Sequence, residues 1–132
     1  MMALTCLQFD GSSVKISNAG MPPILFFKKG EGTIEEVSIS NMPLGSLKDF
    51  EYEMIELPVE SGDTFLLYTD GLPELQNSKE EMYSYERLLN KFENVVSKTA
   101  NEIKDELKNS YISWVGDIDP EDDITFIVVK IN

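Results

Sequence analysis

The sequence has no histidine and a single cysteine, Cys6, among its 132 residues. One cysteine cannot form an internal disulfide. Without histidine the chain lacks the base on which Ser-His-Asp and Cys-His catalysis depend, and it can form no histidine-ligated metal site. Because Cys6 lies in an apolar run with no base to activate it, we interpret it as a small buried residue rather than a nucleophile.

Basic residues are also scarce. Eleven lysines and arginines stand against 24 aspartates and glutamates, which gives a formal net charge of −13. Nucleic acids and anionic membranes are bound through basic surfaces, so this composition argues against both as partners. An acidic protein that handles a phosphorylated substrate would need cations to mask its own field.

Long hydrophobic runs are missing as well. No apolar stretch approaches the roughly 18 residues of a membrane span. Residues 1–10 lack the basic start of a signal peptide. We therefore expect a cytoplasmic protein, or the cytoplasmic part of a larger one. The length and the 42% apolar content predict one globular domain over residues 1–132.

The first half of the chain has the short alternating runs of a β protein. Such runs predict strands at residues 3–9, 13–19 and 24–29, a strand or a connector at residues 33–39, and a further strand at residues 52–59. The first two flank Asp10-Gly11 and should form a hairpin. In the last, Tyr52 and Met54 are expected to point inward. A further run, residues 64–69, is apolar on both faces, which is typical of a central buried strand.

The period then changes from strand to helix. Apolar residues recur at helical spacing in residues 83–96 and 100–115. Thr99 and Glu102 match a capping box that begins the second helix, and Gly116 matches its end. The chain closes with residues 124–131, a second strand that is apolar on both faces.

This order of elements predicts an α+β layered architecture in which two helices cover one face of a sheet. The closing strand should lie antiparallel to residues 64–69, because both need burial on two faces. Asp70, which follows one strand, would then lie at the same rim as Asp122 and Asp123, which precede the other.

Carboxylates that converge at one rim repel each other by about 4 kcal/mol for two charges 4 Å apart at an effective dielectric constant near 20. A hard cation such as Mg²⁺ or Mn²⁺ between them would relieve the repulsion, since such ions prefer oxygen ligands. The spacing alone leaves two interpretations open. Asp70-Gly71 can belong to a metal site, or it can be an ordinary turn with Asp122-Asp123 as a solvated loop.

Four segments, in this order and spacing, carry a family resemblance: SNAGMPPILF, MPLG, SGDTFLLYTDGLPEL and EDDITFIVV. They resemble the C-terminal two-thirds of a SpoIIE-type phosphatase domain, a branch of the metal-dependent (PPM-type) serine/threonine protein phosphatases. The resemblance implies an αββα sandwich with a two-metal site, usually Mn²⁺ or Mg²⁺, at one edge between the sheets. A water that bridges the metals then attacks the phosphorus of a phosphoserine or phosphothreonine.

By motif matching, the resemblance implies that Asp70 and Asp122 are metal ligands. It implies that Gly71 keeps the backbone close and that Asp123 supports the rim rather than ligating. The expected substrate is a phosphorylated regulatory protein. In this branch that protein is often a STAS-type anti-sigma-factor antagonist within a partner-switching pathway.

The chain also departs from the family pattern. The strands and helices that open the family's domain have no counterpart here. That part of the family's domain contains a glycine-aspartate motif whose aspartate bridges both metals, and this motif also has no counterpart. Met21 stands where the family often has histidine. Two carboxylates would hold Mg²⁺ only weakly. We therefore expect the full-length parent to be an enzyme and this chain alone to be weakly active or inactive.

The same departure leads to an alternative function. Without the opening strands and helices, apolar sheet faces and an edge strand would be exposed, which natural proteins avoid. The chain could then self-associate as a homodimer through its exposed sheet. In that case it would serve as a non-catalytic, phosphatase-like interaction module.

Overall fold

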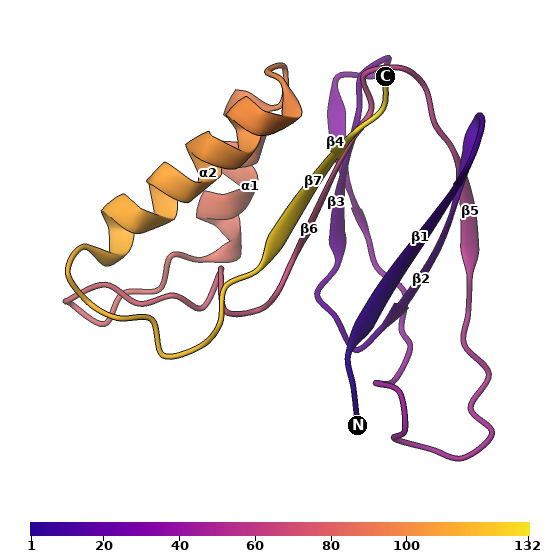
Figure 1. Cartoon of the computed structure of the whole chain (residues 1–132), viewed down its shortest axis with the longest axis horizontal. Coiled ribbons are helices and arrows are strands. Elements are labelled where there is room, and N and C mark those ends of the chain that lie inside the picture. Colours follow the sequence, from indigo (N-terminus) through magenta and orange to yellow (C-terminus); the bar gives the residue numbers. More distant parts are fainter.

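Two antiparallel sheets lie face to face, and a pair of helices covers the outer face of one of them (Figure 1). The computed structural model describes all residues from 1 to 132. The three-stranded sheet has the order β1 (Leu4–Asp10), β2 (Ser13–Ala19), β5 (Ile55–Pro58). The four-stranded sheet has the order β4 (Thr33–Val37), β3 (Ile24–Lys28), β6 (Thr64–Tyr68), β7 (Phe126–Lys130). The helices α1 (Tyr85–Val95) and α2 (Ala100–Val115) lie on this second sheet.

The predicted α+β architecture is confirmed, including the hairpin of β1 and β2 and the antiparallel pairing of β6 with β7. The hairpin turns through Gly11, whose φ of 56° is easily reached only without a side chain. The helical layer is present on one side only, so the arrangement is three layers of the αββα sandwich that the resemblance implied (Figure 1).

Strands β3 and β6 separate two hydrophobic cores. Phe26 and Phe65 point between the sheets, where their rings stack with centroids 4.3 Å apart. Their neighbours Leu25 and Leu66 point the other way, into the core beneath the helices. Successive strand residues face opposite sides, so a strand that serves two cores must be apolar throughout. The predicted central position of residues 64–69 is confirmed.

Three burial predictions are wrong. Cys6 is exposed, because it lies on the face of edge strand β1 that no second layer covers. Met54 is 58% exposed, because strand β5 begins only at Ile55 and the inward positions fall one residue later. Ile127 is 55% exposed, because β7 is the edge of its sheet and this side chain lies outside both cores.

The predicted helix signals are confirmed. The Thr99 hydroxyl accepts from the Glu102 backbone N–H, the Glu102 carboxylate accepts from Thr99, and Gly116 ends α2. Glu106 of α2 pairs with Lys91 and Lys98 at 2.8 and 2.6 Å. Hydrogen bonds from these two ammonium groups lower the pKa of the Glu106 carboxyl to about 2. Neither helix has the length and apolar character that a bilayer crossing requires.

Asp63 is a buried carboxylate with a structural role. It is 5% exposed, and its two oxygens accept the backbone N–H groups of Lys29 and Glu60 at 2.9 and 2.8 Å. It thereby joins the start of β6 to the end of β3 and to the preceding turn. Because both partners are N–H donors, residue 63 must offer a hydrogen-bond acceptor at each of its two terminal side-chain atoms.

Replacing Asp63 with asparagine should therefore destabilise the protein, because the amide would face one N–H donor with another. A buried donor without a partner costs about 1–3 kcal/mol. Urea unfolding of Asp63→Asn measures the loss. Asp10→Asn, at an exposed position of the β1–β2 hairpin, is the control and should change stability little. Equal stability of both variants would contradict this role.

Candidate functional site

Strands β6 and β7 bring the two acidic segments of the sequence to one rim. Their antiparallel register ends with Tyr68 opposite Phe126. One step further, the Thr69 N–H donates to the Thr125 carbonyl at 2.9 Å. The residues after Thr69 and before Thr125 therefore leave the sheet side by side. The prediction that Asp70 lies at the same rim as Asp122 and Asp123 is confirmed for the backbone.

Thr69 holds this rim together, a role that the sequence did not reveal. Its hydroxyl oxygen accepts the Thr125 N–H at 3.1 Å, and its proton points toward the carbonyl oxygens of Thr125 and Asp123, at 3.3 and 3.4 Å. The side chain thus links the end of β6 to Thr125 and Asp123, which precede β7. Only the pairing of the two strands, and not the spacing of residues, identifies the partners of Thr69.

Gly71 allows the two segments to come close. The residue is buried, and a Cβ atom added to it would overlap the backbone carbonyl oxygen of Asp123. The same added atom would lie 3.6 Å from Cβ of Asp122. The space beside Gly71 is therefore filled by the Asp122–Asp123 backbone, and this contact brings Asp122 beside the residue that follows Asp70.

The two candidate ligands, Asp70 and Asp122, are both exposed at this rim. One carboxylate oxygen of Asp122, Oδ1, accepts the Asp123 N–H at 2.8 Å, which orients the group. The five ion pairs of the protein all lie elsewhere, so no lysine or arginine neutralises either carboxylate. An uncompensated pair of carboxylates is suited to a hard cation.

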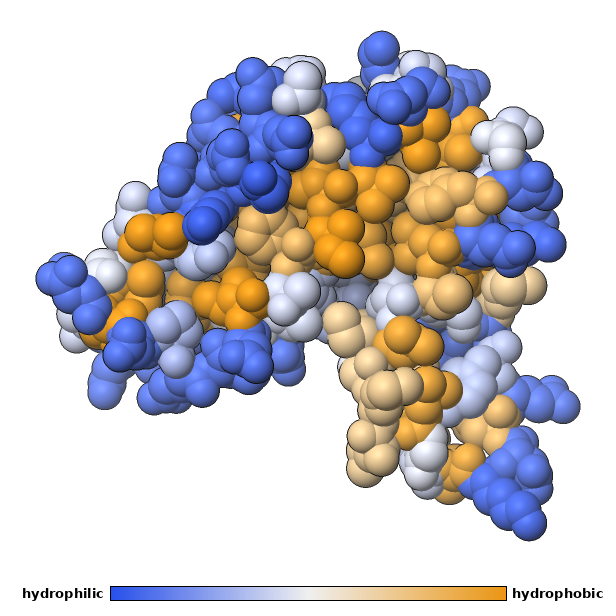
Figure 2. All heavy atoms as spheres, viewed as in Figure 1, coloured by the Kyte–Doolittle hydropathy of each residue, from blue (hydrophilic) through white to orange (hydrophobic).

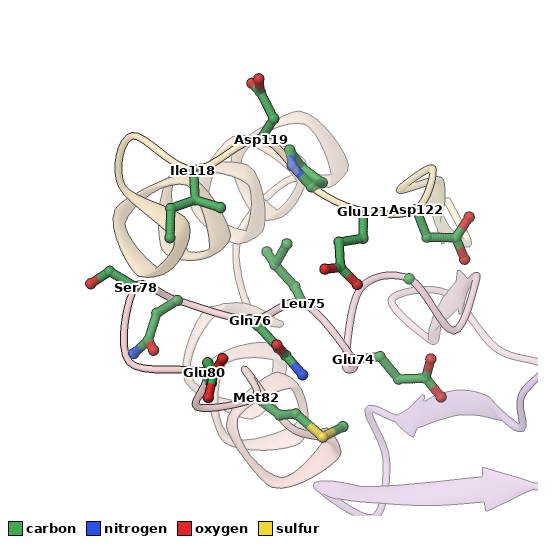
Figure 3. Close-up of a pocket in the computed structure, with 13 residues that line it drawn as sticks. Glu74, Leu75, Gln76, Ser78, Glu80, Met82, Ile118, Asp119, Glu121 and Asp122 are labelled. Atoms are coloured by element: carbon green, nitrogen blue, oxygen red, sulfur yellow. The ribbon is translucent and has the colours of Figure 1, made fainter.

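A cavity of about 610 Å³ begins at this rim and extends between residues 71–82 and 118–122 (Figure 3). Its lining includes Gly71, three apolar side chains and five acidic ones, but no basic one. The acidic residues are Glu74, Glu80, Asp119, Glu121 and Asp122, and the apolar ones are Leu75, Met82 and Ile118. We call this cavity the acidic cleft.

The chain does not by itself fit a complete metal centre. It has no group of three or more histidine, cysteine or acidic side chains placed to hold a metal ion. Asp10 lies at the β1–β2 hairpin, and Asp63 accepts backbone N–H groups at the opposite end of β6, so neither can complete the site. Met21 shares a small apolar cavity with Thr69 and Thr125, so a thioether stands close to the rim. The role of Asp70 and Asp122 as metal ligands stays a prediction.

Adding a methyl group at Gly71 tests the close contact. In Gly71→Ala the new Cβ meets backbone that cannot turn aside, so residues 122–124 must shift. Such overpacking costs about 1–3 kcal/mol, and urea unfolding measures it. The matched control is Gly30→Ala, whose added atom would lie 3.6 Å from the nearest side chain. If Gly71→Ala were as stable as the control, the contact would not constrain the rim.

Comparison with known proteins gives one consistent result. The profile of the SpoIIE family, described as Stage II sporulation protein E, matches residues 1–132. Stage II sporulation protein E of Bacillus subtilis (strain 168) is 28% identical over 130 residues, which cover 98% of this chain and 15% of that protein. The phosphoserine phosphatase RsbU of the same organism is 26% identical over 125 residues, which cover 92% of this chain and 36% of RsbU.

A solved structure agrees with the fold. The phosphatase domain of the cell fate determinant SpoIIE from Bacillus subtilis, presoaked with manganese, superposes with a TM-score of 0.72 at 22% identity. The match covers 98% of this chain and 56% of that one. This chain thus spans about half of the solved domain and a smaller part of the two relatives. Since the family profile matches the chain from end to end, the protein belongs to the SpoIIE family.

Proposed function

We propose that this chain is part of a metal-dependent phosphatase that removes phosphate from phosphoserine or phosphothreonine on a regulatory protein. The observation that carries the proposal is the rim itself. Thr69 bonds to Thr125, Gly71 lies against the Asp122–Asp123 backbone, and neither Asp70 nor Asp122 forms an ion pair. Membership of the SpoIIE family supports the same activity, and the name of the relative RsbU describes a phosphoserine phosphatase.

In this proposal Asp70 and Asp122 are metal ligands, while Gly71 and Asp123 shape the rim around them. The ion is Mn²⁺ or Mg²⁺, which suits oxygen donors. Two carboxylates hold such an ion weakly, so the remaining ligands must come from other polypeptide or from solvent. Residues 1–132 then act as one unit that supplies part of the site. We expect little or no hydrolysis by this chain alone.

The resemblance of the motifs extends the proposal to the substrate. A phosphorylated STAS-type anti-sigma-factor antagonist is the substrate class that we propose, within a cytoplasmic signalling pathway. The net charge of −13 is compatible with a protein substrate, since the cation would mask the field that repels a phosphate.

Removing one ligand tests this function. In the longest natural protein that contains this chain, Asp70→Asn should lower the Mn²⁺-dependent hydrolysis of p-nitrophenyl phosphate about a hundredfold. Even indirect partners of metal ligands cost about 10–100-fold when removed. Asp123→Asn is the matched control and should have a much smaller effect. Full activity of Asp70→Asn would exclude its role as a ligand.

A second candidate function, a self-associating interaction module, is favoured by the open side of the sandwich. Edge strands β1 and β7 both line an apolar cavity of about 190 Å³. Leu4 and Ile127 lie there with 45% and 55% of their surface exposed. Figure 2 shows apolar surface gathered in the middle of this view, beside the helices. A second copy could cover this side and pair with a free strand edge.

Sedimentation velocity tests the association. We expect a dimer at micromolar concentration, and Ile127→Asp should convert it to monomer because the charge would be buried at the contact. Ile112→Asp is the control, since Ile112 is 45% exposed but lies on α2. A stable monomer of the unchanged chain would rule out this candidate.

A further inference from the structure

We propose that the acidic cleft is a docking groove for a segment of the phosphoprotein substrate that is rich in lysine or arginine. The inference rests on the proposed phosphatase function and adds to it the chemical character of the substrate around the phosphorylated residue. Three features of the cleft support it: its position, its apolar lining and its charge.

The position of the cleft links it to the rim. Gly71 and Asp122 belong both to the rim and to the lining of the cleft. A phosphorylated side chain that reached Asp70 and Asp122 would therefore place neighbouring residues of its own chain in the cleft. The volume of about 610 Å³ is within the usual range of ligand sites and has room for several side chains.

The apolar lining indicates a ligand with hydrocarbon as well as charge. Met82 and Ile118 stand at the cleft with 48% and 42% of their surface exposed, and Leu75 is buried beside them. Methionine adapts to varied partners, which suits a peptide-binding surface. Lysine and arginine have long methylene stems that can cover such side chains while the charged end reaches a carboxylate.

The negative charge of the cleft favours a positively charged ligand. The cleft has two walls, one of residues 118–122 and the other of residues 76–82. Figure 3 shows the carboxylate of Glu121 in the space between them and Glu80 on the second wall. No ion pair neutralises either carboxylate. Lys79 is not part of the lining, and Arg87 stacks on the ring of Trp114 with 4.2 Å between its Cζ and the ring centroid. A cationic segment is complementary to this surface, and an acidic one would be repelled.

Hydrogen bonds fix the wall of residues 76–82 in the absence of a ligand. The Asn77 side chain accepts the backbone N–H groups of Lys79 and Glu81 at 2.9 and 3.0 Å. The Trp114 indole donates to the Glu81 carbonyl at 3.2 Å, which ties the wall to α2. A groove that is already formed loses less conformational entropy on binding a peptide.

Binding of short fluorescent peptides, followed by anisotropy, tests the inference. One peptide carries lysines around a central serine, and its partner carries glutamates in their place. Because the whole protein is negative, any basic peptide will be attracted to some extent. The decisive comparison is therefore between two variants that lose the same charge. Glu80→Gln/Glu121→Gln changes the cleft, and Glu51→Gln/Glu93→Gln changes exposed carboxylates outside its lining that form no ion pair.

We expect the lysine peptide to bind more tightly than the glutamate peptide. The cleft variant should weaken its binding about threefold to tenfold, as expected for two exposed charge pairs, and the control variant should weaken it much less. Equal weakening in both variants would assign the attraction to the overall field and overturn the inference. A lack of preference between the peptides would overturn it as well.

The same variants, made in the longest natural protein that contains this chain, separate this inference from the proposed activity. Hydrolysis of p-nitrophenyl phosphate, which has no neighbouring residues to place in the cleft, reports on the metal site and should be the same in both variants. Metal-dependent hydrolysis without a preference for the lysine peptide would leave the phosphatase proposal standing and end the docking proposal. A cleft-specific preference without hydrolysis would support the docking proposal and contradict the phosphatase proposal.

Discussion

The antiparallel pairing of β6 with β7 is the interaction on which the rest of the structure depends. It joins segments that are more than fifty residues apart in the chain, and the helices lie between them in sequence. The main-chain ladder ends in the bonds of Thr69 to Thr125, and the side chain of Thr69 extends the link to Asp123. Without this pairing Asp122 would not lie beside Gly71, and neither the rim nor the acidic cleft would exist.

The two cores explain why the sandwich is open on one side. Strands β3 and β6 are buried on both faces, between the second sheet and the helices. The three-stranded sheet has a partner on its inner face only, so the outer face of β1 and the side chain of Cys6 meet solvent. Hydrophobic burial therefore stabilises the middle of the molecule, while Leu4 and Ile127 stay exposed at its edges.

The basic side chains that form ion pairs lie away from the rim and the acidic cleft. Lys91 and Lys98 converge on Glu106 and join the two helices, and Lys28 pairs with Glu31 and Glu35 on the hairpin of β3 and β4. Few basic groups are left for the remaining acids of a chain with a net charge of −13. The rim and the acidic cleft therefore keep their negative charge, which makes a cation and a cationic peptide complementary to neighbouring parts of one surface.

Local patterns predicted most of the fold because they reflect forces that act over a few residues. The capping box at Thr99 and the end at Gly116 set the limits of α2, and the all-apolar run of residues 64–69 identified a strand buried on two faces. Period-two alternation failed at Met54, where the strand begins one residue later than the pattern suggested. Cys6 and Ile127 were misjudged because an apolar residue on an edge strand looks the same in sequence as one under a second layer.

The sequence by itself determined which residues could form the site, since Asp70-Gly71 and Asp122-Asp123 follow and precede the two most apolar strands. Only the tertiary structure decided how they meet. The close contact at Gly71, the bonds of Thr69 and the wall of residues 76–82 opposite Glu121 all depend on strand register and on the placing of loops. Register and loop placement arise from contacts between distant segments, and no local pattern of residues encodes them.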